Sequence, residues 1–275
     1  MPDSGSVDLG VRGRGFVVVG GTAGMGLAAA EVLAEEGANV ALVARNVQSA
    51  ERAAASLADR HGVKAIGLAA DVSQSADEVD AAILRAHQAL GEIAGLAVTT
   101  GTDYEHSRRP LADTSDDDWR ASFEDIALGT IRCCRAVLPR LIGRGGGTIV
   151  TTAAYSVHAP DPPAIAYSSL KSAVATYTKG LAKTYGPSGV RANCICPGAI
   201  KSERVADMLQ GLADGRGIPH DLALERAMLD EWHLDIGLGR FGRTREVGEL
   251  MAFLLSERAA YLTGALINID GGTNF

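Results

Sequence analysis

The segment Phe16-Val17-Val18-Val19-Gly20-Gly21-Thr22-Ala23-Gly24-Met25-Gly26 is a short apolar run followed by a glycine-rich turn with the spacing GxxxGxG. The apolar run predicts a buried strand, and residues 25–36, which are rich in Ala, Leu and Glu, predict the helix that follows it. Glycine permits backbone conformations closed to other residues and lets an anionic group approach a helix N-terminus. The turn is therefore a candidate dinucleotide site, with contacts expected from Gly20, Thr22, Gly24, Met25 and Gly26. Tight packing of strand on helix without a ligand is the alternative interpretation.

Downstream of this turn, short β-branched runs alternate with longer helical stretches. The expected strands are 39–43, 64–69, 94–99, 148–152, 190–196 and 265–269, and the expected helices are 47–60, 76–90, 115–142 with an interruption near Gly129, 165–185 and 245–255. Strands separated by helices imply βαβ units with right-handed crossovers and a parallel sheet covered on both faces. The prediction is an α/β fold: a single-domain, Rossmann-like, doubly wound parallel sheet of about seven strands with helices on both faces.

The chain shows no Pro/Gly-rich linker and no internal repeat, so we expect one domain over residues 15–275 after a flexible tail at 1–14. A long insertion at 199–240 carries two weak helical patterns, at 203–212 and 221–232. It follows the sixth strand, where ligands bind in open α/β sheets. Its apolar residues either pack as a core or form an apolar lid over a substrate; they are Met208, Leu209, Leu212, Leu222, Leu224, Met228, Leu229 and Trp232.

Composition excludes several classes of function. The 275 residues are 47% hydrophobic and carry a net charge of −7, which argues against a nucleic-acid binder. No run of 18 apolar residues and no apolar leader region is present, so we expect no membrane partner and a cytoplasmic protein. The four cysteines are expected to be buried free thiols, and the scattered histidines predict no metal site. The acidic cluster at 113–118 is typical of a solvated helix start.

The second expected strand ends Leu42-Val43-Ala44-Arg45, where a dinucleotide fold recognises the ribose. An NAD site uses a carboxylate there for the 2′-hydroxyl, and Ala44 cannot supply one. Arg45 offers planar cationic donors for a 2′-phosphate, which favours NADP(H) over NAD(H) as the cofactor. An exposed arginine at a helix start is the alternative. Asp71-Val72 follows the third strand, where Asp71 either reaches the adenine ring or caps the next helix.

Tyr167 and Lys171, in the stretch Tyr-Ser-Ser-Leu-Lys, are one helical turn apart and share a face of the expected helix. A free tyrosine holds its proton at neutral pH, and a neighbouring ammonium stabilises the phenolate. Tyr167 can then donate a proton to a carbonyl, or remove one from an alcohol, as a general acid/base. A half-buried tyrosine beside a surface lysine is the alternative interpretation of this common spacing.

Along the chain, the glycine turn is followed by Asp71, the Tyr167–Lys171 pair, Pro197-Gly198 and the ending Leu262-Thr263-Gly264-x-x-Ile267-x-Ile269-Asp270-Gly271-Gly272. In this order they resemble the short-chain dehydrogenase/reductase family over about residues 15–273. The resemblance implies a Rossmann-like seven-stranded sheet, a homodimer or homotetramer, and hydride transfer to or from a nicotinamide. It also implies that Lys171 binds the nicotinamide ribose beside Tyr167, and that Ile200 and Ser202, after Pro197 and Gly198, approach the carboxamide.

The chain departs from the family pattern at three places. The fourth strand ends Val98-Thr99-Thr100-Gly101 instead of Asn-Asn-Ala-Gly; Gly101 is retained as a cofactor contact, and we expect Thr99 to take over a backbone hydrogen bond. The catalytic serine position, thirteen residues before the tyrosine, is Ala154, and the catalytic asparagine position is Ile126. Two of the four expected catalytic groups are therefore apolar here.

Three hypotheses account for the missing hydroxyl. Ser156, two residues on, replaces it; or the substrate's own hydroxyl or a water fills the gap; or redox chemistry is weak and the fold serves as an NADP-binding or regulatory protein. The leading prediction is an NADP(H)-dependent oxidoreductase that interconverts a ketone and a secondary alcohol on an apolar small molecule, with Tyr167, Lys171 and Ser156 as its catalytic residues. The alternative enzyme is an isomerase, dehydratase or lyase on the same scaffold.

Overall fold

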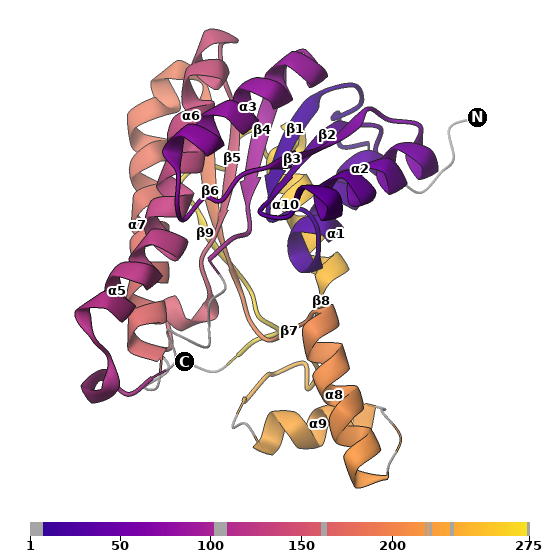
Figure 1. The fold of residues 1–275 in the computed structure, drawn as a ribbon, viewed down its shortest axis with the longest axis vertical. Coiled ribbons are helices and arrows are strands. Elements are labelled where there is room, and N and C mark those ends of the chain that lie inside the picture. Colours follow the sequence, from indigo (N-terminus) through magenta and orange to yellow (C-terminus); the bar gives the residue numbers. More distant parts are fainter. Residues whose placement is uncertain are drawn as a thin grey trace.

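The computed structural model describes residues 8–101, 109–160, 164–217, 219, 222–231 and 234–273. Its centre is a seven-stranded sheet in the order β3-β2-β1-β4-β5-β6-β9, in which neighbouring strands are parallel (Figure 1). This confirms the predicted doubly wound sheet. The strands are β1 (Gly15–Val19), β2 (Asn39–Ala44), β3 (Ala65–Ala69), β4 (Ile93–Val98), β5 (Gly147–Thr152), β6 (Val190–Pro197) and β9 (Leu266–Ile269).

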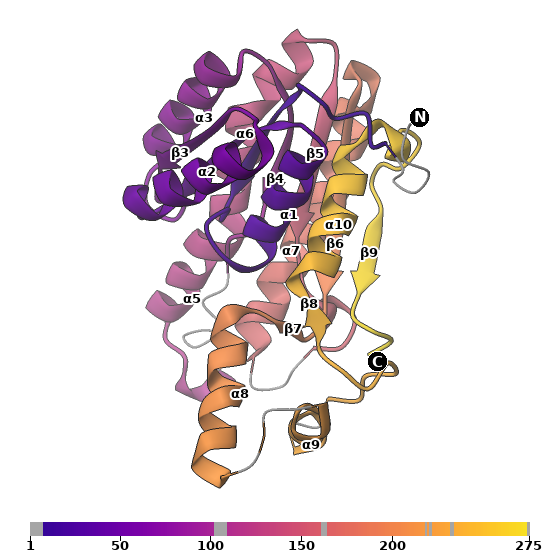
Figure 2. The ribbon, with the colours of Figure 1, turned by 90° about the vertical axis from the view of Figure 1, so that its right-hand side faces the viewer.

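Helices cover both faces of the sheet (Figures 1 and 2). One face carries α1 (Gly24–Glu35), α2 (Val47–His61) and α10 (Thr244–Leu255), and the other carries α3 (Ala76–Leu90), α6 (Gly129–Gly143) and α7 (Ile165–Tyr185). Short 3₁₀ turns occur at η1 (Leu111–Asp113), η3 (Tyr155–Val157), η5 (Gly186–Ser188) and η6 (Glu257–Ala259). Within the described residues, no helix combines the length and the apolar character needed to cross a bilayer.

The domain has an apolar core on each face of the sheet, and the side chains of β1 alternate between them. Val17 and Val19 belong to the cluster that packs under α3 and α6, while Phe16 and Val18 belong to the cluster under α1 and α10. Alternate side chains of a strand point to opposite faces, so a continuous apolar run is what a strand buried on both faces requires.

The expected helix at 115–142 is divided into two α-helices and a π-helical turn, where the sequence indicated one interruption near Gly129. α5 (Asp116–Ser122) begins with a capping box between Ser115 and Asp118, and α6 begins at Gly129. Between them residues Phe123–Leu128, labelled η2, form a π-helical turn, a feature frequent at functional sites. A side chain at Gly129 would lie 2.9 Å from a methyl of Val72, so glycine lets α6 pack against the loop after β3.

The insertion forms a compact unit of α8 (Glu203–Arg216) and α9 (Leu222–Glu231) that projects beyond the carboxyl ends of the strands (Figures 1 and 2). β7 (Ile200–Lys201) pairs with β8 (Gly242–Arg243) and closes its base. The Lys201 Nζ–Glu225 Oε1 ion pair, at 2.6 Å, ties β7 to α9.

The apolar side chains of this insertion mainly pack on one another. Leu209, Met228 and Leu229 are buried in its own cluster, which favours the core interpretation over the lid interpretation for these three. Met208 is 42% exposed. The side chains of Leu222 and Leu224, and all of Trp232, lie outside the described part of the chain.

Residues 8–14, which we expected in a flexible tail, are packed against the domain. Val11 is fully buried, Arg14 pairs with Glu257 at 2.6 Å, and Arg258 donates to the Asp8 carbonyl. The apolar Val11 side chain and the two arginine contacts explain why this segment is held despite its Gly- and Arg-rich composition. Residues 1–7 of the expected tail lie outside the described residues.

Candidate active site

The order of the strands reverses between β1 and β4, and the candidate site lies at the carboxyl ends of these strands. Thr99, directly after β4, donates from both its backbone N and its Oγ1 to the Val19 carbonyl, each at 2.9 Å. The expected backbone hydrogen bond of Thr99 is thus confirmed. Strand reversal leaves a crevice in open α/β sheets because the following helices run to opposite faces.

The glycine turn joins β1 to α1 at this crevice. Gly20 has φ +81°, and a side chain at Gly26 would lie 2.3 Å from the Gly20 carbonyl oxygen. Both positions therefore require glycine for the turn to close against the helix. The N-cap of α1, Ala23, provides no side-chain hydrogen bond, whereas side chains cap α2, α3, α5 and α8. The first N–H groups of α1 therefore have no side-chain acceptor among the residues that the structure describes, as an anion site at a helix N-terminus requires.

The segment after β6 passes close to this turn. Gly198 packs on Asp270, where a side chain would lie 2.7 Å from the Asp270 Cα. Ser202 caps α8 by accepting from the Val205 N–H at 3.4 Å, and its Cβ lies 4.0 Å from where a Gly24 Cβ would be. The structure thus brings Ser202, with Ile200 in the neighbouring β7, to the glycine turn.

The residues expected at the adenosine end follow β2 and β3. Arg45 is exposed directly after Ala44. The Asp71 carboxylate accepts from the backbone N–H and the hydroxyl of Ser73, at 2.9 and 2.6 Å. The helix-cap alternative for Asp71 is wrong, because Ser75 caps α3. Val72 is buried beside α6.

Tyr167 and Lys171 lie one turn apart on α7, with the Lys171 Nζ 5.6 Å from the centre of the Tyr167 ring. Lys171 is only 2% exposed, so the surface-lysine alternative is wrong. Its Nζ donates to the carbonyl of Thr152 at 3.0 Å and of Thr100 at 3.5 Å, which end β5 and follow β4. Neighbouring parallel strands place these carbonyls side by side beneath the ammonium.

Burial of the Lys171 ammonium lowers its pKa from 10.5 to about 8, and the nearby Asp125 carboxylate partly opposes this effect. Gly101, with φ +84°, makes room for the ammonium: a side chain there would lie 3.4 Å from Nζ and 3.0 Å from the Ile126 Cα. The π-helical turn thus places Ile126 against Gly101, next to Lys171. The Ile126 carbonyl accepts from Thr130 Oγ1 at 2.8 Å.

Ser156 lies in η3, which packs against α7. The residue is 3% exposed, and its hydroxyl has no hydrogen-bond partner among the described residues. Ala154 is also buried, at 5% exposure. A buried hydroxyl without a partner is costly, which is consistent with a group that acquires its partner on binding a ligand.

Two contributors to this site were missed from the sequence: Thr100 and Thr152. Their carbonyls hold Lys171, and their hydroxyls are buried without partners among the described residues. Each stands at the carboxyl end of one of two neighbouring strands, and this placement is the signal that could have identified them.

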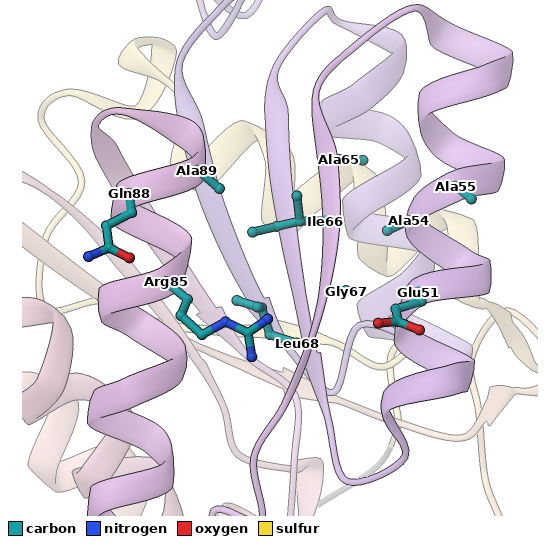
Figure 3. Close-up of a pocket in the computed structure, with 10 residues that line it drawn as sticks. All are labelled: Glu51, Ala54, Ala55, Ala65, Ile66, Gly67, Leu68, Arg85, Gln88 and Ala89. Atoms are coloured by element: carbon teal, nitrogen blue, oxygen red, sulfur yellow. The ribbon is translucent and has the colours of Figure 1, made fainter.

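Two cavities lie elsewhere. One, of about 570 Å³, sits over the edge strand β3 between α2 and α3, beside Glu51 and Arg85 (Figure 3). Another, of about 500 Å³, lies at the amino ends of β5 and β6. Among the described residues, one group has metal-ligand spacing, formed by Glu31, Glu35 and His61, but Arg60 and Arg245 already pair with its carboxylates.

Known proteins resemble the chain along nearly its whole length. The family model described as enoyl-(acyl carrier protein) reductase matches residues 20–274. The 2-(S)-hydroxypropyl-CoM dehydrogenase 3 of Xanthobacter autotrophicus is 34% identical over 94% of this chain and 95% of its own. Dehydrogenase/reductase SDR family member 4 of Caenorhabditis elegans is 30% identical over 95% of each chain. The structure of L-sorbose reductase from Gluconobacter frateurii with NADPH and L-sorbose aligns with a TM-score of 0.87 and 31% identity, covering 97% of this chain and 98% of that one.

Proposed function

Because the chain belongs to the short-chain dehydrogenase/reductase family of oxidoreductases, we propose that it interconverts a carbonyl and a secondary alcohol with NADP(H), and that Tyr167 is its general acid/base. The observation that carries this proposal is the buried Lys171 ammonium beside Tyr167, fixed at the carboxyl ends of β4 and β5. Thr100, whose carbonyl accepts from Lys171, also lies against the glycine turn: its methyl is 3.4 Å from where a side chain on Gly20 would be.

The residues at this crevice fit a dinucleotide. Among the described residues, a side chain at Gly24 would meet only Ser202 within 4 Å, which leaves space above the start of α1 for a diphosphate. We assign diphosphate contacts to the turn from Gly20 to Gly26. Arg45 and Asp71-Val72 are assigned to the adenosine end, and Gly101, Tyr167, Lys171 and the segment Pro197, Gly198, Ile200 and Ser202 to the nicotinamide end.

Each residue has a defined role in carbonyl reduction. A bound reduced nicotinamide supplies the hydride. Tyr167 donates its phenolic proton to the carbonyl oxygen, and Lys171 stabilises the resulting phenolate by its charge. Ser156 donates a hydrogen bond to the oxygen where negative charge develops, in place of the hydroxyl that Ala154 lacks. In the oxidation direction the same groups act in reverse.

Absorbance of the reduced nicotinamide provides the direct test. Oxidation of NADPH in the presence of a panel of ketones supports the proposal. Product formation without a change in the cofactor would instead indicate an isomerase, dehydratase or lyase. Saturable NADPH binding with no turnover on any substrate would indicate a dinucleotide-binding protein.

The dinucleotide-binding alternative is favoured by one observation: the serine and asparagine positions of the family carry Ala154 and Ile126. A missing donor at a developing oxyanion lowers the rate by about 10²–10³-fold. The buried Ser156 hydroxyl and the retained Tyr167–Lys171 pair support the enzyme over this alternative.

Arg45 is the basis for proposing NADP(H) over NAD(H). We expect Arg45→Ala to weaken NADPH binding by about 10–100-fold, because it removes charge-assisted hydrogen bonds to the 2′-phosphate. Binding of NADH, which lacks this phosphate, is expected to stay unchanged. Fluorescence titration of both cofactors measures the effect, and Arg52→Ala, an exposed arginine on α2, is the matched control. Equal weakening of both cofactors would contradict the assignment.

Lys171 predicts the pH dependence of the reaction. With its pKa lowered to about 8, Lys171 is charged below that pH and loses its charge as the pH rises through it. Reduction requires the charged ammonium to stabilise the Tyr167 phenolate, so kcat for reduction is expected to fall as the pH rises through about 8. A kcat–pH profile in the reduction direction checks this; a rate that stays constant across this range would contradict it.

The proposed substrate is an apolar small molecule. Ile126 and Ala154 make two positions of the site apolar, and Met208 on α8 is partly exposed. Fewer residues support an apolar substrate than the sequence indicated, because several apolar side chains of the insertion pack in its own core. The ketone panel therefore includes alicyclic ketones and matched polar sugars.

Self-association as a homodimer or homotetramer is proposed from the free edge of the sheet. β9 is an edge strand, and exposed apolar residues gather on it and nearby: Phe253 (36%), Tyr261 (103%), Leu262 (38%) and Leu266 (38%). An exposed apolar edge is a surface that folded proteins usually cover.

A further inference from the structure

Arg132 on α6 extends to the loop between β3 and α3. Its Nη1 donates to the carbonyl oxygens of Val72 and Ser73, at 2.9 and 2.7 Å. In the described part of the chain, no other group donates to either carbonyl. The Arg132 side chain is only 13% exposed, so these charge-assisted hydrogen bonds lie largely out of water, where they are strong. The position of the loop therefore depends on a side chain from another helix.

Glu124, in the π-helical turn, fixes the same guanidinium. Its Oε2 lies 2.9 Å from Arg132 Nη1 but forms no hydrogen bond to the described residues. A terminal guanidinium nitrogen carries two hydrogens, and the two loop carbonyls accept both, so Glu124 contributes its charge alone. The turn that places Ile126 against Gly101 thus also anchors the loop after β3.

Ser73 connects Arg132 to Asp71. The Ser73 carbonyl accepts from Arg132, while its N–H and hydroxyl donate to Asp71 Oδ1 at 2.9 and 2.6 Å. Two hydrogen bonds to one oxygen fix the orientation of the carboxylate, and with it the direction of the second oxygen. Among the described residues, no hydrogen bond uses Asp71 Oδ2. This oxygen is therefore left to accept a hydrogen bond from a ligand.

We propose that Arg132 is a positioning residue for adenine recognition: through Ser73 it fixes the Asp71 carboxylate so that Oδ2 accepts from the 6-amino group of the ring. This inference rests on the proposed function, which assigns Asp71 to the adenosine end of the cofactor. In hypoxanthine a carbonyl oxygen replaces the amino group, and a carboxylate repels that oxygen. A fixed Asp71 consequently discriminates adenine from hypoxanthine.

Binding of NADPH and of its hypoxanthine analogue, followed by fluorescence titration, tests this inference without turnover. The wild-type protein is expected to bind NADPH about 10–100-fold more tightly than the analogue, the value of a hydrogen bond to a charged group. Arg132→Ala is expected to reduce this preference to about threefold or less, because Asp71 then adopts the binding orientation in a minority of molecules. The loss is expected in NADPH affinity, with kcat at saturating NADPH nearly unchanged.

Two further variants test the connection through Ser73. Arg132→Lys keeps a cationic donor for the two carbonyls and is expected to retain most of the preference for adenine. Ser73→Ala removes one of the two hydrogen bonds to Asp71 and is expected to give an intermediate preference. Because Ser73→Ala leaves α6 and its guanidinium intact, it tests the inference even if Arg132→Ala folds poorly.

Arg135→Ala is the matched control, since Arg135 is an exposed arginine on the same helix, and it is expected to keep the wild-type preference. A merely structural role of Arg132 predicts a lower Tm and equal weakening of both dinucleotides, with the preference retained. That result would overturn the inference, as would a wild-type protein that binds the two forms equally.

The titrations also separate this inference from the proposed function. A protein that binds NADPH with the expected preference but oxidises it with no ketone refutes the proposed function and leaves the role of Arg132 standing. A protein that reduces ketones but does not distinguish the two bases refutes the role of Arg132 alone. Binding of neither dinucleotide would overturn both.

Discussion

Tyr167→Phe is expected to lower kcat for ketone reduction by about 10²–10⁴-fold, the range that a positioned general acid contributes. The phenolic oxygen is the only atom removed, and the ring keeps its place on α7 near the Lys171 ammonium. NADPH affinity is therefore expected to remain nearly unchanged. Steady-state kinetics with NADPH and a reactive ketone, together with a cofactor titration, measure the two effects separately.

Tyr177→Phe is the matched control for this variant. Tyr177 lies on the same helix but packs, half-buried, against the cluster of α3 and α6, so the identical atom is removed away from the site. Wild-type kcat in Tyr177→Phe and a large loss in Tyr167→Phe assign the acid to Tyr167. Equal effects in both variants would attribute the loss to the helix and contradict the assignment.

Ser156→Ala is expected to lower kcat by about 10²–10³-fold, because it removes a hydrogen-bond donor aimed at developing negative charge. The hydroxyl is buried in η3 and forms no hydrogen bond to the described residues, so its loss breaks none of the hydrogen bonds that the structure describes. The Tm is consequently expected to change little. Kinetics and a melting curve on the same preparation test both statements.

Ser168→Ala is the control for this variant, since Ser168 on α7 is also buried and its hydroxyl has no hydrogen-bond partner in the described part of the chain. Full activity in Ser156→Ala would rule out Ser156 as the replacement donor. The substrate's own hydroxyl or a water would then fill the gap at Ala154. Ketones with and without an adjacent hydroxyl distinguish these two sources by their relative kcat/KM.

The doubly wound parallel sheet and the position of the glycine turn could be predicted because each depends on local patterns. A strand buried on both faces is apolar throughout, as Phe16–Val19 is, and GxxxGxG between a strand and a helix leaves few alternative conformations. The order of motifs along the chain then indicated that the turn and the Tyr167–Lys171 pair meet at the carboxyl ends of the strands.

The contacts of Lys171 could not be predicted from residue types, because they join residues far apart in sequence. Two backbone carbonyls hold the ammonium, and carbonyls leave no residue-type signal. Similarly, Asp71 and Ser75 both precede α3 as possible caps, and only the turn geometry selects Ser75. Residues 8–14 are packed against the domain instead of forming the expected tail, because Val11 belongs to the apolar cluster under α1 and α10 and two arginine contacts hold the segment.

The insertion begins and ends at the same place in the fold. β7 lies beside β8, and the Gly242 N–H donates to the Ala199 carbonyl at 2.9 Å, while the residues between them enclose their own apolar cluster. A segment that departs and returns through two touching strands can be exchanged, lengthened or shortened without disturbing the register of the main sheet. Such a change would alter only the segment beyond the carboxyl ends of the strands, where ligands bind in open α/β sheets, and would leave the sheet and its glycine turn in place.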